Sequence, residues 1–299
     1  MNLARRGRMR AAGSVAHVCE EGWSMTGSIS VIMPAYNEAR HIARNLLEVV
    51  ETLSSFEYEF EVIVVDDGSP DKTYLEAAKL LSTHPERVRV VHYDENRGKG
   101  NALICGASFA RGDYVVLLDA DMDLHPSQLP VLFGIMDAQN ADVVIGSKRH
   151  PNSVVNYPWH RRVASWGYYS LVRLLFGLPV KDTQTGMKVF KRAVLDRVFP
   201  RILAKRFAFD VEVLANAHHL GYKIVDAPVT LEFQRGTFGR LKPRDIYLIM
   251  LDTLAIFYRM RILKYYDRSP NFFTGEIQKE TSAREFEPSH GRLAQLEPK

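Results

Sequence analysis

Short apolar runs alternate with amphipathic segments through the first half of the chain. The apolar runs show little alternation, which is typical of strands that are buried on both faces of a sheet. They cover residues 29–34, 60–65, 88–92, 114–118 and 142–146. Between them, apolar residues recur at helical spacing, as Ile42, Leu46 and Val49 do. This order predicts an α/β fold whose central sheet is mostly parallel and carries helices on both faces.

The second half of the chain is less regular. Its predicted elements are a helix at 159–176, a polar turn at 181–188, a helix near 210–220, a strand at 224–233, a loop at 234–242 and a helix at 245–263. No apolar stretch reaches the ~18 uncharged residues that a membrane-spanning helix needs. The two apolar helices are therefore expected to be buried or to lie at a membrane surface.

Composition divides the chain into four parts. Residues 1–27 are basic without periodicity and are predicted to be a disordered extension, and the polar residues 267–299 a disordered tail. Residues 28–242 carry the strand and helix pattern and are predicted to form a single domain. Residues 243–266 are predicted to be an amphipathic C-terminal helix that suits a membrane surface.

Charge and cysteine content narrow the function further. The net charge of +4 is too small to favour nucleic acid as a partner, but it suits an anionic substrate or a membrane surface. The two cysteines, Cys19 and Cys105, lie far apart in the sequence. They predict neither a disulfide framework nor a metal site, so a reducing compartment is favoured.

Three carboxylates follow the apolar run at 114–118. In an extended segment alternate residues share a face, so Asp119, Asp121 and Asp123 are expected to point the same way. Mutual repulsion would be relieved by a divalent cation, and oxygen ligands suit Mg²⁺ or Mn²⁺. The alternative is a solvated acidic loop. The position at the carboxyl end of a buried strand favours the metal site, because open α/β sheets bind ligands there.

Polar clusters follow three other predicted strands. Tyr36 offers a ring for stacking a base, Asp67 can accept hydrogen bonds, and Gly98 and Gly100 allow close approach of a ligand to the backbone. Each cluster alone reads as an ordinary turn, but four clusters in register predict a nucleotide site. The sequence has no GxGxxG, GxxxxGK[ST], GxSxG or HExxH motif, which argues against dinucleotide, P-loop, serine hydrolase and zincin sites.

These clusters resemble glycosyltransferase family 2. The motifs that carry the resemblance are PAYNE at 34–38, VVDDGSPD at 64–71, NRGKGNAL at 96–103 and LLDADMDLHP at 117–126. Within that family, the runs GSK at 146–148, DTQTGMKVF at 182–190 and FAFDVEVL at 207–214 are similar to polyprenyl- and dolichyl-phosphate sugar transferases. Glucose-transferring members resemble the chain most, and mannose-transferring members come next.

The resemblance implies a single Rossmann-like, nucleotide-sugar-binding domain of the GT-A type and a set of site residues. The implied nucleotide-sugar-binding residues are Pro34, Tyr36, Glu38, Val65, Asp67, Lys99, Asp119, Ala120, Asp121 and Lys242. The implied metal ligands, for Mg²⁺ or Mn²⁺, are Asp119, Asp121 and Asp123. The implied catalytic residues are Asp119, Asp121, Lys148 and Arg235.

The acceptor implied by the resemblance is a lipid phosphate, which needs cations to place it beside an anionic donor. Lys148, Arg161 and Ser165 are the candidates, and an aromatic, apolar helix follows the last two. A plain amphipathic core helix with solvated arginines is the alternative interpretation. The expected enzyme is an inverting transferase that moves a hexose, with UDP-glucose favoured, to polyprenyl phosphate. It would lie on the cytoplasmic face of a membrane, and an integral-membrane partner is compatible with this location.

Three other functions remain open on the sequence. The first is the same transfer with GDP-mannose as the donor. The second is a transferase of the same fold with a saccharide acceptor, which needs a general base such as Asp182, Asp210 or Glu212. The third is a regulatory subunit that binds nucleotide sugar without turnover, against which the complete set of carboxylates argues.

Overall fold

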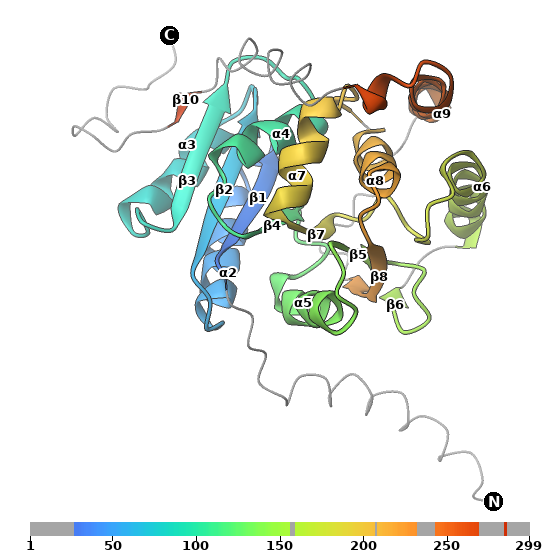
Figure 1. The fold of residues 1–299 in the computed structure, drawn as a ribbon. Coiled ribbons are helices and arrows are strands. Elements are labelled where there is room, and N and C mark those ends of the chain that lie inside the picture. The colour runs from blue at the N-terminus through green and yellow to red at the C-terminus, as the bar shows by residue number, and fades with distance from the viewer. Residues whose placement is uncertain (1–26, 156–158, 207, 232–242, 269–283, 286–299) are drawn as a thin grey trace, which may run out of the picture.

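The computed structural model describes residues 27–155, 159–206, 208–231, 243–268 and 284–285. An eight-stranded sheet forms its centre, in the order β10-β3-β2-β1-β4-β7-β5-β8 (Figure 1). The strands are β1 (Ile29–Ala35), β2 (Phe60–Asp67), β3 (Val88–Tyr93), β4 (Tyr114–Leu118), β5 (Val143–Ser147), β7 (Met187–Lys191), β8 (Ile224–Pro228) and β10 (Arg284–Glu285). Two short strands, β6 (Val154–Val155) and β9 (Thr230–Leu231), pair separately in parallel.

Most strands of the sheet are parallel, as predicted. β1 pairs in parallel with β2 and β4, β2 with β3, and β5 with β8. β7 runs antiparallel between β4 and β5, and β10 runs antiparallel along the edge strand β3. Arg284 and Glu285 of β10 belong to the tail that the sequence predicts to be disordered, so the prediction is wrong for these two residues. They pair with His92 and Val91 and so cover part of the edge of β3.

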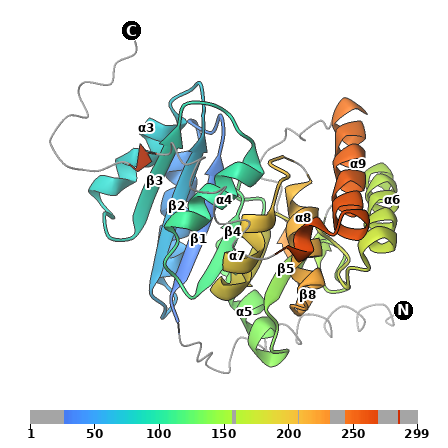
Figure 2. The same ribbon diagram turned by 45° about the horizontal axis from the view of Figure 1, so that its top comes forward.

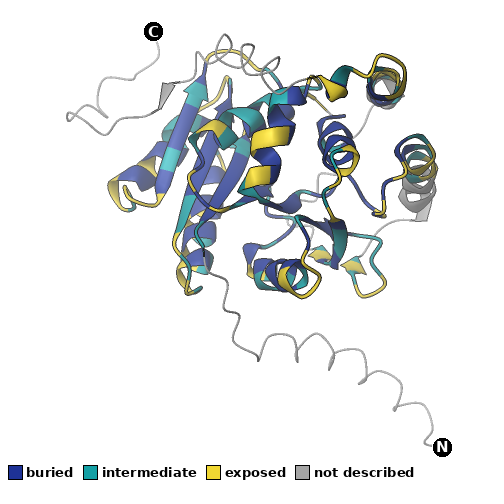
Figure 3. Ribbon diagram, in the orientation of Figure 1, coloured by how far each residue is buried: buried dark blue, intermediate teal, exposed yellow. Residues whose placement is uncertain are grey.

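Helices cover both faces of the sheet (Figures 1 and 2). They are α2 (Ile42–Ser54), α3 (Thr73–Ala78), α4 (Lys99–Phe109), α5 (Leu129–Ala138), α6 (Trp159–Phe176), α7 (Arg192–Val198), α8 (Phe209–His219) and α9 (Pro243–Phe257). The core residues of α2, α3 and α5 pack on one face, and those of α4, α7 and α8 on the other. Successive residues of β1 serve opposite faces, since Val31 packs with the first group and Ile32 with the second. The central strands are therefore buried on both sides (Figure 3).

The chain reverses its direction of travel across the sheet next to β1. From β1 it moves outward through β2 and β3, and it then returns to place β4 on the other side of β1. In open α/β sheets a crevice forms outside the carboxyl ends of the strands at such a switch point, and ligands bind there. This topology places the segments after β1 and β4 side by side.

The elements that were not predicted include β7 and α7. The pattern predicted a polar turn up to residue 188, but β7 runs from Met187 to Lys191. Lys188 interrupts the apolar pattern of this strand and is nevertheless buried, with 2% of its surface exposed. Its Nζ donates to Asp210 Oδ1 at 2.8 Å. This tertiary partner allows the charged side chain to be buried in a strand, which the sequence pattern alone did not indicate.

α6 and α9 lie side by side at the margin of the domain (Figure 2). The hydroxyls of Tyr168 and Thr253 are 3.0 Å apart, and the rings of Phe176 and Phe257 meet edge to face. α9 continues into a π-helical turn, Tyr258–Ile262. Throughout the described ranges, each helix is too short or too polar to cross a bilayer.

Candidate active site

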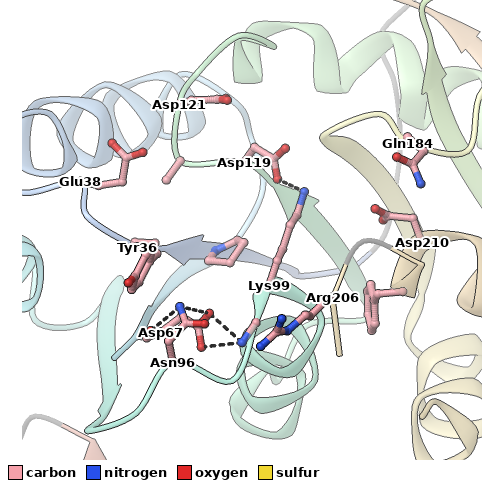
Figure 4. Close-up of a pocket in the computed structure, with 15 residues that line it drawn as sticks. Tyr36, Glu38, Asp67, Asn96, Lys99, Asp119, Asp121, Gln184, Arg206 and Asp210 are labelled. Carbon is pink, nitrogen blue, oxygen red and sulfur yellow. Dashed lines mark hydrogen bonds and ion pairs between the residues drawn. The ribbon is translucent and has the colours of Figure 1, made fainter. Parts of the chain in front are cut away.

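A cavity of about 600 Å³ opens at the carboxyl ends of β1, β2, β3 and β4 (Figure 4). It is lined by Pro34, Ala35, Tyr36, Glu38, Asp67, Asn96, Gly98, Lys99, Asp119, Ala120, Asp121, Gln184, Arg206, Phe209 and Asp210. All four polar clusters predicted at strand ends contribute to this wall. The predicted nucleotide-binding residues Pro34, Tyr36, Glu38 and Ala120 therefore lie where one ligand can reach them. We refer to this space as the donor pocket.

Val65, one of the predicted nucleotide-sugar-binding residues, does not line the donor pocket. Its side chain is fully buried and packs in the core on the α4 side of the sheet. A Cβ added to Gly106 of α4 would lie 3.1 Å from Val65 Cγ2, so the helix presses closely on this residue. Val65 thus supports the floor of the site without offering a side chain to a ligand.

The carboxylate of Asp67 is hydrogen-bonded to the end of β3 and to the loop that follows it. Its carboxylate accepts hydrogen bonds from Tyr93 Oη at 2.6 Å, from Arg97 N at 2.9 Å and from Asn96 Nδ2 at 3.1 Å. The N–H of Gly98 donates to Asp67 Oδ2 at 3.0 Å, and Gly98 has a φ of +94°, which favours glycine. Asp67 therefore shapes the wall of the donor pocket by fixing the turn into α4.

Asp119 and Asp121 both line the donor pocket, but not because the segment is extended. β4 ends at Leu118, and the chain then turns, with Met122 in the left-handed region at a φ of 59°. The expectation of a shared face on an extended segment is wrong for this reason. The turn is tied down because Asp119 N donates to Gly186 O at 3.1 Å.

Lys99, at the start of α4, reaches across the donor pocket to Asp119. Its Nζ lies 2.5 Å from Asp119 Oδ1. Desolvation lowers the pKa of Lys99, but the nearby carboxylates of Asp119, Asp210 and Asp121 outweigh this effect and raise it overall. The ammonium group therefore stays charged at the centre of the pocket.

Asp121 carries negative charge that is poorly compensated. Burial and, to a smaller extent, the neighbouring carboxylates Asp119 and Asp123 together raise its pKa to about 6. The backbone N–H of Asp123 donates to Asp121 Oδ1 at 3.2 Å. A divalent cation bound by carboxylate oxygens would relieve this repulsion, so the chemistry of the donor set fits Mg²⁺ or Mn²⁺.

The three aspartates do not by themselves complete a metal site. No group of three or more His, Cys, Asp or Glu side chains in the described parts of the chain is arranged to hold a metal ion. Asp119 and Asp121 line the donor pocket, whereas Asp123 does not line it and instead lines a second cavity beside it. Protein-bound Mg²⁺ commonly takes one or two carboxylates and completes its shell with water and substrate phosphates.

A second cavity, of about 210 Å³, adjoins the donor pocket on the side of β5 and β7. It is lined by Leu118, Asp119, Asp121, Asp123, Leu124, Lys148, Gln184, Thr185, Gly186 and Leu231. Lys148, predicted to bind the acceptor phosphate, lies here with its Nζ 3.6 Å from Asp182 Oδ2. Asp119, Asp121 and Gln184 line both cavities. We refer to the second space as the acceptor cavity, after the acceptor phosphate that Lys148 is predicted to bind.

The three candidate general bases have different surroundings. Asp210 lines the donor pocket and pairs with Lys188 at 2.8 Å. Asp182 accepts from the backbone N–H groups of Lys148 at 3.2 Å and Gln184 at 3.1 Å, so it holds two loops together.

Glu212 is fully buried away from both cavities, where it accepts hydrogen bonds from Leu203 N at 3.0 Å and Ala204 N at 2.6 Å and from Tyr266 Oη. Burial raises its pKa. Glu212 therefore orders the loop before α8 and cannot reach an acceptor hydroxyl.

Several predicted residues lie outside the described part of the site. Arg235 and Lys242 fall in residues 232–242, which the structure does not describe. Arg161 and Ser165 lie on α6, whose backbone is described there without the side chains. Their predicted roles at the diphosphate and the acceptor phosphate stay predictions.

Sequence reasoning assigned no binding role to Asn96, Gln184, Arg206 or Phe209, all of which line the donor pocket. The DTQTGMKVF and FAFDVEVL runs pointed to two of these segments through the family resemblance alone. Phe209 also fixes the start of α4, because a Cβ on Gly100 would lie 2.6 Å from its ring.

Comparison with known proteins agrees with the fold and identifies the family. The family model described as Glycosyl transferase family 2 matches residues 30–199, more than half of the chain, so the chain belongs to this family. This confirms the resemblance predicted from the motifs.

Three curated relatives extend the comparison. The Haloferax volcanii protein named Glycosyltransferase AglD is 35% identical over 206 residues, which are 68% of this chain and 33% of that protein. The human Dolichyl-phosphate beta-glucosyltransferase is 32% identical over 80% of this chain and 77% of its own length. Polyprenol monophosphomannose synthase from Mycolicibacterium smegmatis is 34% identical over 67% of this chain and 76% of its own length. The chain thus spans about a third of the first relative and about three quarters of the other two.

The fold is similar to that of solved transferase structures. Glucosyl-3-phosphoglycerate synthase from Mycobacterium tuberculosis, in complex with Mn²⁺, UDP-glucose and phosphoglyceric acid, has a TM-score of 0.56. The identity is 22%, and the match covers 77% of this chain and 78% of that chain. At this identity the likeness supports the GT-A type of nucleotide-sugar-binding fold and nothing more specific.

Proposed function

We propose that this protein transfers a hexose from a nucleotide diphosphate sugar to a polyprenyl phosphate. The observation that carries the proposal is the meeting of the donor pocket and the acceptor cavity at Asp119 and Asp121. The donor pocket lies at the switch point of the sheet, where such folds bind nucleotides. The acceptor cavity brings Lys148 to the same carboxylates, and a cation is what an anionic acceptor requires.

The donor would lie across the donor pocket from Tyr36 to Lys99. Tyr36 is 44% exposed and offers its ring to a base, and the Lys99 ammonium is placed to meet a diphosphate. Asp119 and Asp121 would hold Mg²⁺ or Mn²⁺, which supplies charge stabilisation to the departing diphosphate. Arg235 and Lys242 are proposed to approach the same diphosphate from the loop that follows β9.

The acceptor would enter beside Lys148. A phosphate monoester is already anionic at neutral pH, so it needs placement rather than a general base. Lys148 is held toward the acceptor cavity by Asp182, which binds both its Nζ and its backbone N–H. Attack from this side, opposite the diphosphate, would invert the configuration at the anomeric carbon.

The names of the relatives support a polyprenyl phosphate as the acceptor and are compatible with two different sugar donors. UDP-glucose comes first because the human relative is named as a dolichyl-phosphate glucosyltransferase, and GDP-mannose comes second because the mycobacterial relative is named as a mannose synthase. A saccharide acceptor is the second candidate function, since Asp210 lines the donor pocket. A general base must lie within reach of the acceptor hydroxyl, and Asp210 is the candidate base that lines this pocket.

The purified protein is expected to form a lipid-linked hexose from UDP-glucose and a short polyprenyl phosphate in the presence of Mg²⁺ or Mn²⁺. Mass spectrometry of the lipid product, with GDP-mannose and water-soluble saccharides as parallel arms, identifies donor and acceptor. Lys148→Met is expected to lower the transfer to polyprenyl phosphate at least about tenfold, because a charge-assisted contact to the acceptor is lost. Transfer to a soluble saccharide in preference to polyprenyl phosphate would contradict the proposal.

A membrane surface is the proposed location of the acceptor end. α9 and its π-helical turn bury Ile249, Thr253, Ile256 and Met260 against the domain. A second apolar stripe faces outward at helical spacing and consists of Tyr247, Leu251, Leu254, Tyr258 and Ile262, which are 44–62% exposed. The exposed Arg261 and Lys264 flank the last residue of this stripe, Ile262. An apolar face with a basic end suits an anionic bilayer surface such as a cytoplasmic leaflet.

Replacement of Leu251 and Leu254 by Glu is expected to weaken sedimentation with anionic liposomes about tenfold, because charge then replaces the apolar stripe. Transfer to long-chain polyprenyl phosphate in vesicles should fall in parallel, while transfer to a short acceptor in solution should not. Leu47→Glu is the matched control, since Leu47 is an exposed leucine of α2, away from α9. Equal liposome binding by the double variant and the wild type would contradict a membrane role for this stripe.

A further inference from the structure

Gln184 lies at the junction between the two cavities. It lines the donor pocket together with Asp210, and it lines the acceptor cavity together with Lys148. The other residues that line both spaces are Asp119 and Asp121, which carry negative charge. Of these three shared residues, Gln184 alone has a neutral side chain that both donates and accepts hydrogen bonds. Such a group can bind sugar hydroxyls without repelling two phosphates.

The loop that carries Gln184 is held on both sides of this residue. Asp182 Oδ1 accepts from Gln184 N at 3.1 Å, and Asp182 Oδ2 accepts from Lys148 N at 3.2 Å. On the other side, Lys188 Nζ donates to Thr185 O. The next residue, Gly186, accepts from Asp119 N at 3.1 Å. The amide of Gln184 is therefore presented from a fixed backbone, which is what a positioning group requires.

Figure 4 shows the order of the groups along the donor pocket. Tyr36 lies on one side, Lys99 and Asp119 lie in the middle, and Gln184 and Asp210 lie on the opposite side. A nucleotide sugar whose base meets Tyr36 and whose diphosphate meets Lys99 places its sugar toward Gln184. Asp210 is less available to that sugar, because its Oδ1 already accepts from Lys188 Nζ at 2.8 Å.

We propose that Gln184 binds hydroxyls of the transferred sugar and thereby positions the anomeric carbon between the diphosphate and the acceptor phosphate. The inference rests on the proposed function and adds the residue that recognises the sugar. In the transfer, an oxygen of the acceptor phosphate forms a bond to the anomeric carbon while the bond to the diphosphate oxygen breaks. The diphosphate leaves with the electron pair, and Gln184 exchanges no proton.

The test compares two ligands that differ only by the sugar. Gln184→Met keeps the length of the side chain and removes its hydrogen bonds, and calorimetry in the presence of Mn²⁺ measures the affinities for UDP and for UDP-glucose. We expect the variant to bind UDP within about twofold of the wild type and UDP-glucose about five- to tenfold more weakly, as the loss of one or two hydrogen bonds implies. Gln139→Met, the same change at an exposed glutamine next to α5, should alter neither affinity.

Each outcome of this comparison decides one of the two proposals. Unchanged UDP-glucose binding by Gln184→Met, or an equal loss for UDP and UDP-glucose, would overturn the role in sugar recognition. GDP and GDP-mannose provide a second pair of ligands, for which the same pattern is expected if mannose is the sugar transferred. Failure of the wild type to bind either nucleotide sugar would instead refute the proposed function.

Discussion

Gly186→Ala is expected to lower sugar transfer about 100-fold while the protein stays folded, because small displacements of reacting groups have effects of this size. A methyl group at this position would lie 2.5 Å from Asp119 Oδ2 and 2.8 Å from Asp119 Cγ. Rotation of the carboxylate does not relieve the clash, since Asp119 Cβ is only 3.1 Å away. The two residues also share the Asp119 N to Gly186 O hydrogen bond. The substitution therefore displaces the carboxylate on which both cavities depend.

Steady-state transfer assays and calorimetry with Mn²⁺ and UDP measure this effect, and thermal unfolding reports whether the fold is retained. Gly167→Ala is the matched control, because a Cβ at that position of α6 would meet no described residue within 4 Å apart from its own helix. Alanine inside a helix should, if anything, stabilise the control variant. Wild-type turnover by Gly186→Ala would show that the position of Asp119 is not critical.

The parallel part of the sheet could be predicted from the sequence because local pattern and burial agree there. Val31 and Ile32 are adjacent in sequence and pack on opposite faces, so the absence of alternation correctly indicated a strand covered on both sides. β7 could not be predicted in this way. A lysine in this run indicates a loop, because a buried charge needs a partner. That partner, Asp210, lies 22 positions later in the sequence and comes beside Lys188 only in the folded structure.

The candidate site was predictable where residues follow strands and less so where tertiary contacts place them. Tyr36 and Asp119 follow β1 and β4, so the topology alone brings them together. Gln184 and Arg206 come from the loops before β7 and α8, so the packing of these two elements places them at the pocket. Gln184 lies in the DTQTGMKVF run, so the family resemblance pointed to its segment, but no chemical pattern singled out either residue. Asp121 was predicted correctly to lie in the pocket, although a turn rather than an extended segment brings it there.

Asp121→Asn is expected to abolish transfer and, at the same time, to stabilise the metal-free protein. Burial, together with the carboxylates of Asp119 and Asp123, raises the pKa of Asp121 to about 6. An unfolded chain has an Asp pKa of about 3.9. Between these two values the folded protein binds more protons than the unfolded one, so stability falls as the pH rises through that window. Above about pH 6 the penalty is complete and constant.

The amide of Asn carries no charge, so it removes this penalty while removing a proposed cation ligand. Urea unfolding in EDTA should show the variant more stable than the wild type by on the order of 2 to 3 kcal/mol at pH 7, and about equally stable near pH 4. Asp137→Asn, at an exposed aspartate of α5, should change neither stability nor transfer. A variant that loses stability at pH 7 in EDTA would contradict the electrostatic argument. Wild-type transfer by the variant would contradict the role of Asp121. The uncharged amide cannot replace a carboxylate that holds a doubly charged ion beside a leaving diphosphate.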